Sequence, residues 1–313
     1  MHIRIAKPMK YIEDGLDVTG DVKIFYELLP KILERMDIDY RVLELQKSRQ
    51  IFRADDALYL AWHLHGTLPD IWHLKPSYLV DYFYFDRHGY SGWSELAQEY
   101  NYDIDVNSIR DEVQKFANDY ISNNISRLPQ PRNAYLPDEP YVLVLLQRPN
   151  DSVTHHAYIH TNLLLKRIAE LYKGSKYKVC VKAHPLETSM HRDPNIFEAT
   201  GSIHKIIAGA TAVYTMNSGS GFEALLHGKR VFTTGHCDYH WVTDVIKTDE
   251  DLQASINLIE QPVDTDRIIK FLHYCINYHF ANINDEASIE RKLQRAINEY
   301  RAYKSSTKAE TRA

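Results

Sequence analysis

The stretch 213–235, VYTMNSGSGFEALLHGKRVFTTG, constrains the fold more strongly than any other part of the chain. It begins within a β-branched and aromatic run at 211–215, which predicts a buried strand. Small residues at 217–221 then allow a tight turn, and the apolar spacing within 222–226 is that of one helical face. A second strand is predicted at 230–234. A strand, turn, helix and strand in this order predict an α/β fold.

The turn before this helix is a candidate phosphate site. It consists of Asn217, Ser218, Gly219, Ser220 and Gly221. A helix that begins here would direct free N–H groups and the positive end of its dipole at an anion, so we expect a phosphate-bearing ligand at Ser218–Gly221. The alternative is that Ser220 and Glu223 form an S-x-x-E capping box, which would stabilise the helix without any ligand. The sequence leaves both interpretations open.

Length and charge set broad limits on the function. A chain of 313 residues is long enough for two domains of ordinary size. The net charge of −5 provides no overall basic field, which argues against non-specific binding to nucleic acid. Cys180, Cys237 and Cys275 are widely spaced and form neither a metal motif nor a disulfide framework, so we expect a reducing cytoplasm. We also expect no signal peptide in MHIRIAKPMK and no membrane span, because no apolar run reaches roughly 18 residues.

Strands and helices alternate on both sides of segment 126–140, which carries four prolines and resembles a stiff linker. This alternation predicts two doubly wound α/β domains, at 1–130 and 138–285. The charged amphipathic helix at 286–303 is expected to pack back on the first domain, and 304–313 is expected to be a disordered tail.

Segment 63–95 has an unusually high density of aromatic residues and histidines, interrupted by glycine and proline. A long loop-rich segment inside a compact domain is usually functional, and so many aromatic residues argue against disorder. The alternative is that Tyr82, Tyr84 and Phe85 are ordinary strand or core residues. The histidines have no zinc-binding spacing, so we expect structural roles for them.

Three polar segments, 147–152, 182–185 and 217–223, each follow a predicted strand. Ligands of doubly wound domains bind beyond the carboxyl ends of the strands, so these segments should open onto one crevice. Together they supply a carboxylate for nucleophilic or base catalysis, cationic groups and a helix dipole for a phosphate leaving group. No carboxylate pair suited to Mg²⁺ is present, so we expect no metal.

These segments, together with HLKPSYLVDYFYFDRHGYSGWSEL in the first half, resemble the retaining β-Kdo transferases of bacterial capsule polysaccharide synthesis. The matches occur in the family's order and extend over about 57–240. The resemblance implies a GT-B-like fold, with two Rossmann-type domains that face a central cleft. It also implies a CMP-activated sugar acid as donor, no separate cofactor, and a glycan or glycolipid acceptor, with the inner membrane surface as a peripheral location.

The resemblance also assigns residues. It implies that Asp151 is the catalytic carboxylate, proposed to be a nucleophile, and that His184 assists at the CMP phosphate beside Lys182. Glu223 would reach the ribose hydroxyls. The implied donor-binding residues are Gln147, Lys182, Asn217, Ser218, Gly219, Ser220, Gly221 and Glu223. The implied acceptor-side residues are Asp86, Tyr90 and Trp93.

Three other functions share parts of this pattern. A transferase that modifies a hydroxylated DNA base would keep the donor site, and the aromatic segment 63–95 would stack on the base. A nucleotide-sugar epimerase of GT-B fold would act on the donor alone. A binding protein without catalysis is disfavoured by the joint presence of Asp151, Lys182 and His184.

Overall fold

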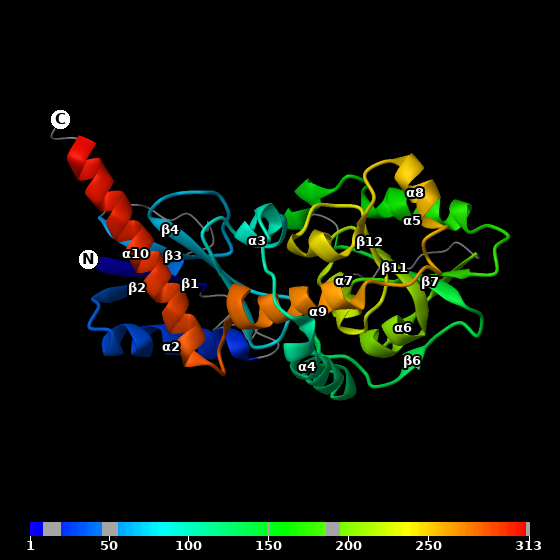
Figure 1. The fold of residues 1–313 in the computed structure, drawn as a ribbon, viewed down its shortest axis with the longest axis horizontal. Coiled ribbons are helices and arrows are strands. Elements are labelled where there is room, and N and C mark those ends of the chain that lie inside the picture. Colours follow the sequence, from blue (N-terminus) through cyan, green and yellow to red (C-terminus); the bar gives the residue numbers. More distant parts are fainter. Residues whose placement is uncertain (9–19, 46–55, 149–150, 186–194, 311–313) are drawn as a thin grey trace. The chain divides into compact units, whose positions relative to one another are not determined.

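The computed structural model describes residues 1–8, 20–45, 56–148, 151–185 and 195–310. The chain forms two compact units (Figure 1). The first unit combines Met1–Glu95 with Cys275–Ala313, and the second unit is Leu96–Tyr274. Over the described ranges, no helix has both the length and the apolar character needed to cross a membrane.

A six-stranded sheet with the order β14-β5-β4-β3-β1-β2 forms the centre of the first unit. Strands β1 to β4 are parallel, whereas β5 runs antiparallel to both β4 and β14. The strands are β1 (His2–Pro8), β2 (Tyr40–Leu45), β3 (Ala57–Trp62), β4 (Ile71–Pro76), β5 (Tyr82–Asp86) and β14 (Ala281–Asn282).

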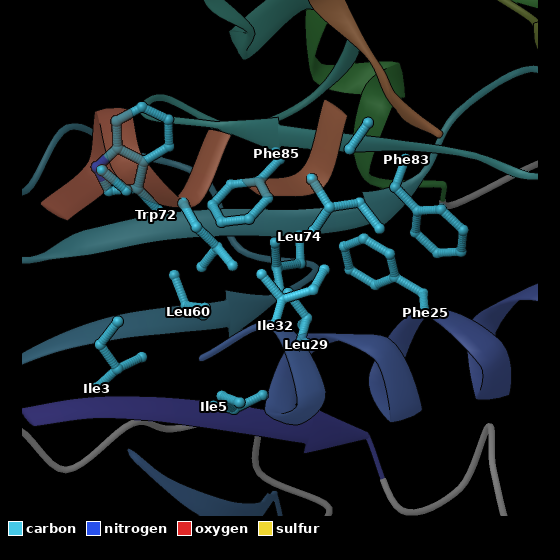
Figure 2. Packing of buried hydrophobic residues seen from close by; sticks show 14 of the residues in the cluster. Ile3, Ile5, Phe25, Leu29, Ile32, Leu60, Trp72, Leu74, Phe83 and Phe85 are labelled. Atoms are coloured by element: carbon cyan, nitrogen blue, oxygen red, sulfur yellow. The ribbon is translucent and has the colours of Figure 1, made fainter. Parts of the chain in front are cut away.

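Two helices, α2 (Asp21–Arg35) and α10 (Glu286–Glu310), share one hydrophobic core with this sheet. The apolar residues of α2 recur at helical spacing, so one face of the helix is buried. Figure 2 shows this packing, in which the ring of Phe25 lies parallel to that of Phe83 with centroids 4.2 Å apart. From α10, Leu293 enters the same core and is fully buried.

The second unit contains a six-stranded sheet that is parallel throughout, with the order β13-β12-β11-β7-β8-β9. All five residues of β7 are buried, as expected for a strand covered on both faces. The strands are β7 (Tyr141–Leu145), β8 (Lys178–Lys182), β9 (Ile196–Glu198), β11 (Ala210–Thr215), β12 (Val231–Thr233) and β13 (Asp244–Val245).

Helices cover both faces of the second sheet (Figure 1). Helices α5 (Thr161–Leu171) and α8 (Asp249–Ser255) share the core cluster on one face. Helices α6 (Ile203–Gly209) and α7 (Gly219–Leu226) contact β11 from the other face. The remaining helices of this unit are α3 (Glu95–Gln98, which begins at the boundary), α4 (Arg110–Ser122) and α9 (Thr265–Tyr274).

The boundary between the units differs from the expected one. Segment 126–140 is not a linker, because it lies inside the second unit and its β6 (Ala134–Tyr135) pairs with β10 (Thr200–Gly201). Side chains fix this segment to the start of α6: Gln130 Oε1 accepts from the Ile203 N–H at 2.7 Å. Prolines reduce the backbone hydrogen bonds of a segment, but tertiary hydrogen bonds hold it in place here.

Two further expectations are corrected. Segment 63–95 is not mainly loop, because it contains β4 and β5. The alternative interpretation of Tyr82, Tyr84 and Phe85 as strand or core residues is confirmed, since all three are buried in β5. Residues 304–310 are helical rather than disordered, because α10 continues to Glu310; an ion pair of 2.7 Å joins Lys304 to Asp56. Residues 311–313 lie outside the described part of the chain.

Candidate functional site

The three polar segments expected to converge are brought to one edge of the second sheet. Strands β11, β7 and β8 are neighbours and run parallel, so their carboxyl ends lie side by side. Segment 217–223 follows β11, segment 147–152 follows β7, and segment 182–185 begins at the last residue of β8. This edge of the second unit is therefore the candidate site.

The turn between β11 and α7 is fixed by hydrogen bonds of its own. Ser218 is the N-cap of α7, and its Oγ accepts from the Ser220 N–H at 3.4 Å. The hydroxyl of Tyr239 donates to Ser218 O at 2.7 Å. The predicted capping box is wrong, because α7 begins at Gly219 and places Glu223 at its fifth position rather than its third.

Gly221 is required by packing. A Cβ atom there would lie 2.7 Å from the Tyr239 hydroxyl oxygen and 2.8 Å from Thr215 Cγ2. The absence of a side chain thus allows α7 to approach β11 closely, which sets the direction of its first turn. Two N–H groups of that turn already have acceptors, because Gly221 N–H donates to Ser218 O at 2.9 Å and Ser220 N–H donates to Ser218 Oγ. The Gly219 N–H and the positive end of the helix dipole are what the turn offers to an anion.

Asn217 joins this turn to two neighbouring segments. Its side chain is buried, and Nδ2 donates to Val153 O at 2.8 Å and to His236 O at 3.4 Å. No group in the described ranges hydrogen-bonds to its buried Oδ1 atom. The structure therefore links the 217–223 segment to Val153, the residue that directly follows the 147–152 segment, a connection that the sequence did not reveal.

Asp151 is the N-cap of a 3-10 helix at Ser152–His156. One carboxylate oxygen accepts from the Val153 N–H and from the Ser152 hydroxyl, both at 3.3 Å. The side chain is half-buried. Gln147 lies at the end of β7, and its buried Oε1 has no hydrogen-bond partner within the described chain. These two residues leave acceptor oxygens available at the edge of the sheet.

Lys182 is the last residue of β8, and its ammonium donates to Ala183 O at 3.1 Å. Burial lowers the pKa of Lys182, and the carboxylate of Glu198 opposes that shift. His184 follows in a half-buried position. A cation and an imidazole therefore lie on the β8 side of the edge.

Glu223 is a buried carboxyl group on α7. Burial raises its pKa to about 7, and hydrogen bonds with Ser126 and Ser220 oppose this shift. One partner, Ser126, lies in the segment after α4, and the other, Ser220, lies in the first turn of α7. Its expected contact with a ribose remains a prediction.

Three histidines that the sequence did not single out form a cluster, and one of them, His236, accepts a hydrogen bond from Asn217 through its backbone oxygen. The rings of His156 and His236 are 5.9 Å apart, and those of His236 and His240 are 4.9 Å apart. Burial, followed by the neighbouring His240, His156 and Lys247, lowers the pKa of His236 to about 4. The available signal was position: His236 and His240 follow the predicted strand 230–234, as the other polar segments follow theirs.

The three residues expected on the acceptor side lie in the first unit. Tyr90 is buried, with the ammonium of Lys75 3.7 Å from the centre of its ring. Trp93 stacks on His65 with ring centroids 3.9 Å apart. Asp86 is also buried.

The Asp86 carboxylate has a structural position. It accepts from the backbone N–H groups of His88 at 2.7 Å, Gly89 at 3.0 Å and Glu95 at 3.0 Å. Burial, with a smaller contribution from the Glu95 carboxylate, raises its pKa to about 7, while the three N–H donors oppose that shift. These bonds hold the loop that carries Tyr90 and Trp93 in place.

Comparison with known proteins places the chain. The family described as "Capsule polysaccharide biosynthesis protein" matches residues 75–281, which is more than half of the sequence. The chain belongs to this family. The expected relationship to capsule polysaccharide synthesis is therefore confirmed. No functionally curated protein matches the sequence.

Solved structures show which fold this family member has. The β-Kdo 2,4-transferase KpsC of Thermosulfurimonas dismutans superposes with a TM-score of 0.51 at 16% identity, covering 86% of this chain and 89% of that chain. The β-Kdo 2,7-transferase KpsC of the same organism gives 0.49 at 18% identity, with 85% and 96% covered. The predicted α/β, GT-B-like fold class is confirmed.

Proposed function

We propose that this member of the capsule family is a glycosyltransferase that moves a sugar from a nucleotide-activated donor to a glycan or glycolipid acceptor. The observation that carries the proposal is the convergence of Asp151, Lys182 and the start of α7 at one edge of the second sheet. Family membership supports a role in capsule polysaccharide synthesis.

The donor phosphate would bind at the first turn of α7. The Gly219 N–H and the helix dipole favour an anion there, and Lys182 adds a cation from strand β8 of the same sheet. These groups would stabilise the nucleotide phosphate as it leaves. We favour a CMP-linked, Kdo-like sugar acid, because the sequence resembles β-Kdo transferases and the fold is that of one.

Transfer would proceed in two displacements with net retention. The Asp151 carboxylate attacks the anomeric carbon as the bond to the nucleotide phosphate breaks, and the bonding electrons leave with the phosphate. The acceptor hydroxyl then attacks the same carbon, displaces the carboxylate and gives up its proton. His184 lies at the same edge and would serve in proton transfer or phosphate contact.

A matched pair of substitutions tests this role. Asp151 and Asp105 are both N-caps of 3-10 helices in the second unit, so Asp151→Ala and Asp105→Ala remove the same kind of structural contact. We expect D151A to lower CMP release from CMP-Kdo in the presence of acceptor by about a thousandfold or more, with CMP affinity within about threefold of wild type. D105A should keep its activity. Loss of CMP binding in D151A, or full activity, would contradict the assignment.

A further inference from the structure

A cavity of about 200 Å³ lies wholly within the first unit. Its walls come from α10 and from the π-helical turn Cys275–His279 that precedes β14. The lining includes Asn277, Tyr278, Phe280, Arg291, Lys292 and Arg295. The volume is enough for one compact polar group or part of a sugar ring, and three of its walls are cationic side chains.

The cations form a separate stripe on α10. Arg291, Lys292 and Arg295 continue a face that begins at Ser288, with the i, i+3, i+4, i+7 spacing of a helix, and all four residues line the cavity. The neighbouring face carries Ile289, Leu293 and Ala296, which are fully buried in the core. The position of the cations is therefore fixed by the packing of the helix.

These cations differ in how far the protein neutralises them. Arg295 binds both oxygens of the Glu95 carboxylate, at 2.7 and 2.9 Å, and also contacts Glu299 at 2.8 Å. Arg291 has a single long contact, 3.4 Å, to Asp285. Both partners of Arg295 hold it against the protein, whereas Arg291 keeps most of its five donors available.

Lys292 is the decisive residue. It is half-buried, and within the described chain its ammonium has neither a hydrogen-bond acceptor nor an ion-pair partner. Burial lowers its pKa to about 8; the Asp86 carboxylate opposes this shift, and Arg295 adds to it. The Glu95 carboxylate also favours the charged form, but it makes no direct contact with the ammonium among the described residues. A partly desolvated cation without a direct partner is costly, and an anion in the cavity would lower that cost.

The aromatic wall suits a sugar. Tyr278 is 55% exposed, although it lines the cavity, and it belongs to the π-helical turn. π-helical turns are rare and occur frequently at functional sites. Phe280 is buried and provides an apolar surface on the same side. An aromatic face next to cationic donors matches a ring that carries an acidic group.

We propose that this cavity binds the acidic group of an anionic glycan, with Lys292 and Arg291 contacting its oxygens and Tyr278 contacting the ring that carries it. The group would be a carboxylate or a phosphate, which share the same recognition by cationic donors. That the glycan is the acceptor rests on the proposed transferase function. The anion site itself does not, since it involves only first-unit residues.

The test is calorimetric titration of the full chain with sodium glucuronate, sodium phosphate and glucose at constant ionic strength. Lys292→Met removes the charge and keeps the stem, and Arg301→Gln removes an exposed charge of the same helix that does not line the cavity. Wild type and R301Q should bind glucuronate, phosphate or both, and should not bind glucose. K292M should weaken that binding at least about tenfold, because hydrogen bonds to charged groups are the strong ones.

The outcomes separate the possibilities. Binding of glucuronate alone would assign an acidic sugar, and binding of phosphate alone would assign a phosphorylated glycan. No saturable binding of either anion, equal binding of glucose, or unchanged affinity in K292M would overturn the proposal. If K292M does not fold, Arg291→Gln at an exposed position provides the same comparison. CMP affinity should be unchanged in K292M, so failure of the donor site would be visible separately.

Discussion

The two units contain sheets of the same size but arrange their polar groups differently. In the second unit all six strands are parallel, and the segments after β7, β8 and β11 meet at one edge. In the first unit β5 runs antiparallel to β4, and its cationic cavity lies instead against α10. A fully parallel sheet gathers its loops, whereas a mixed sheet with a long covering helix can place a site on that helix.

The comparison extends to one buried carboxyl group in each unit. Glu223 and Asp86 both have a pKa raised to about 7 by burial. Asp86 is held by three backbone N–H groups and orders a loop, whereas Glu223 contacts side-chain hydroxyls between α7 and the segment after α4. The two carboxyl groups are therefore similarly buried but have different hydrogen-bond partners. Substitutions can test each unit separately.

The largest effect should come from removing a core side chain in each unit. Leu293 in α10 and Leu164 in α5 are both fully buried, so Leu293→Ala and Leu164→Ala should each cost about 2–5 kcal/mol of unfolding free energy. Hydrogen exchange should rise first in β1–β5 for L293A and in β7–β12 for L164A. Faster exchange in the same strands for both variants would contradict the division of the chain into two units.

An intermediate effect should come from two tightly packed glycines. A Cβ at Gly221 would lie 2.7 Å from the Tyr239 hydroxyl, and one at Gly89 would lie 2.8 Å from His65 Cβ. Gly221→Ala and Gly89→Ala should each cost about 1–3 kcal/mol. Only G221A should weaken CMP binding by calorimetry, because only that residue orients the first turn of α7. Normal CMP affinity in G221A would remove α7 from the donor site.

The smallest effect should be on the pH dependence of stability, with Glu223 acting near neutral pH and His236 acting at acid pH. The Glu223 pKa is raised from 4.5 to about 7, so the stability from its buried neutral form is present below 4.5 and is lost as the pH rises through 7. The loss between pH 6 and 8 should be about 1 kcal/mol. Denaturant titration of Glu223→Gln should show a flatter profile there, and an unchanged slope would contradict this origin.

The stability contribution of His236 depends on pH in the opposite direction and changes at acid pH. Its pKa is lowered from 6.5 to about 4, so its contribution is present above 6.5 and is lost as the pH falls through 4. His236→Gln should therefore be less sensitive to acid than wild type in the same titration. Equal acid sensitivity in both proteins would show that the histidine cluster does not cause the loss of stability at acid pH.

Much of the second unit could be predicted from sequence, because its signals are local. The apolar run 141–145 is continuous, and the small residues at 217–221 mark the turn before α7. What could not be predicted depends on contacts between distant segments. Asn217 binds Val153, and Gln130 binds Ile203, and no periodicity reports either hydrogen bond.

The first unit was harder to predict for the same reason. Aromatic strands β4 and β5 interrupted by glycine and proline resemble loop, and their burial is visible only once α2 and α10 cover them. The helix tail beyond Tyr303 contains no strong apolar pattern, but Lys304 pairs with Asp56. Charged stripes such as 291–295 are usually solvated, so the cavity beside them could be found only in the structure.

The central claim is that the carboxyl edge of the second sheet holds the nucleotide of an activated sugar. Its most direct test is calorimetric binding of CMP, UDP, GDP and ADP to the wild-type chain without added metal. We expect saturable binding of CMP and no comparable binding of the other three nucleotides. Binding of UDP or GDP instead would contradict a CMP-linked donor and assign a donor linked to that nucleotide. No binding of any nucleotide would contradict a phosphate site at Ser218–Gly221.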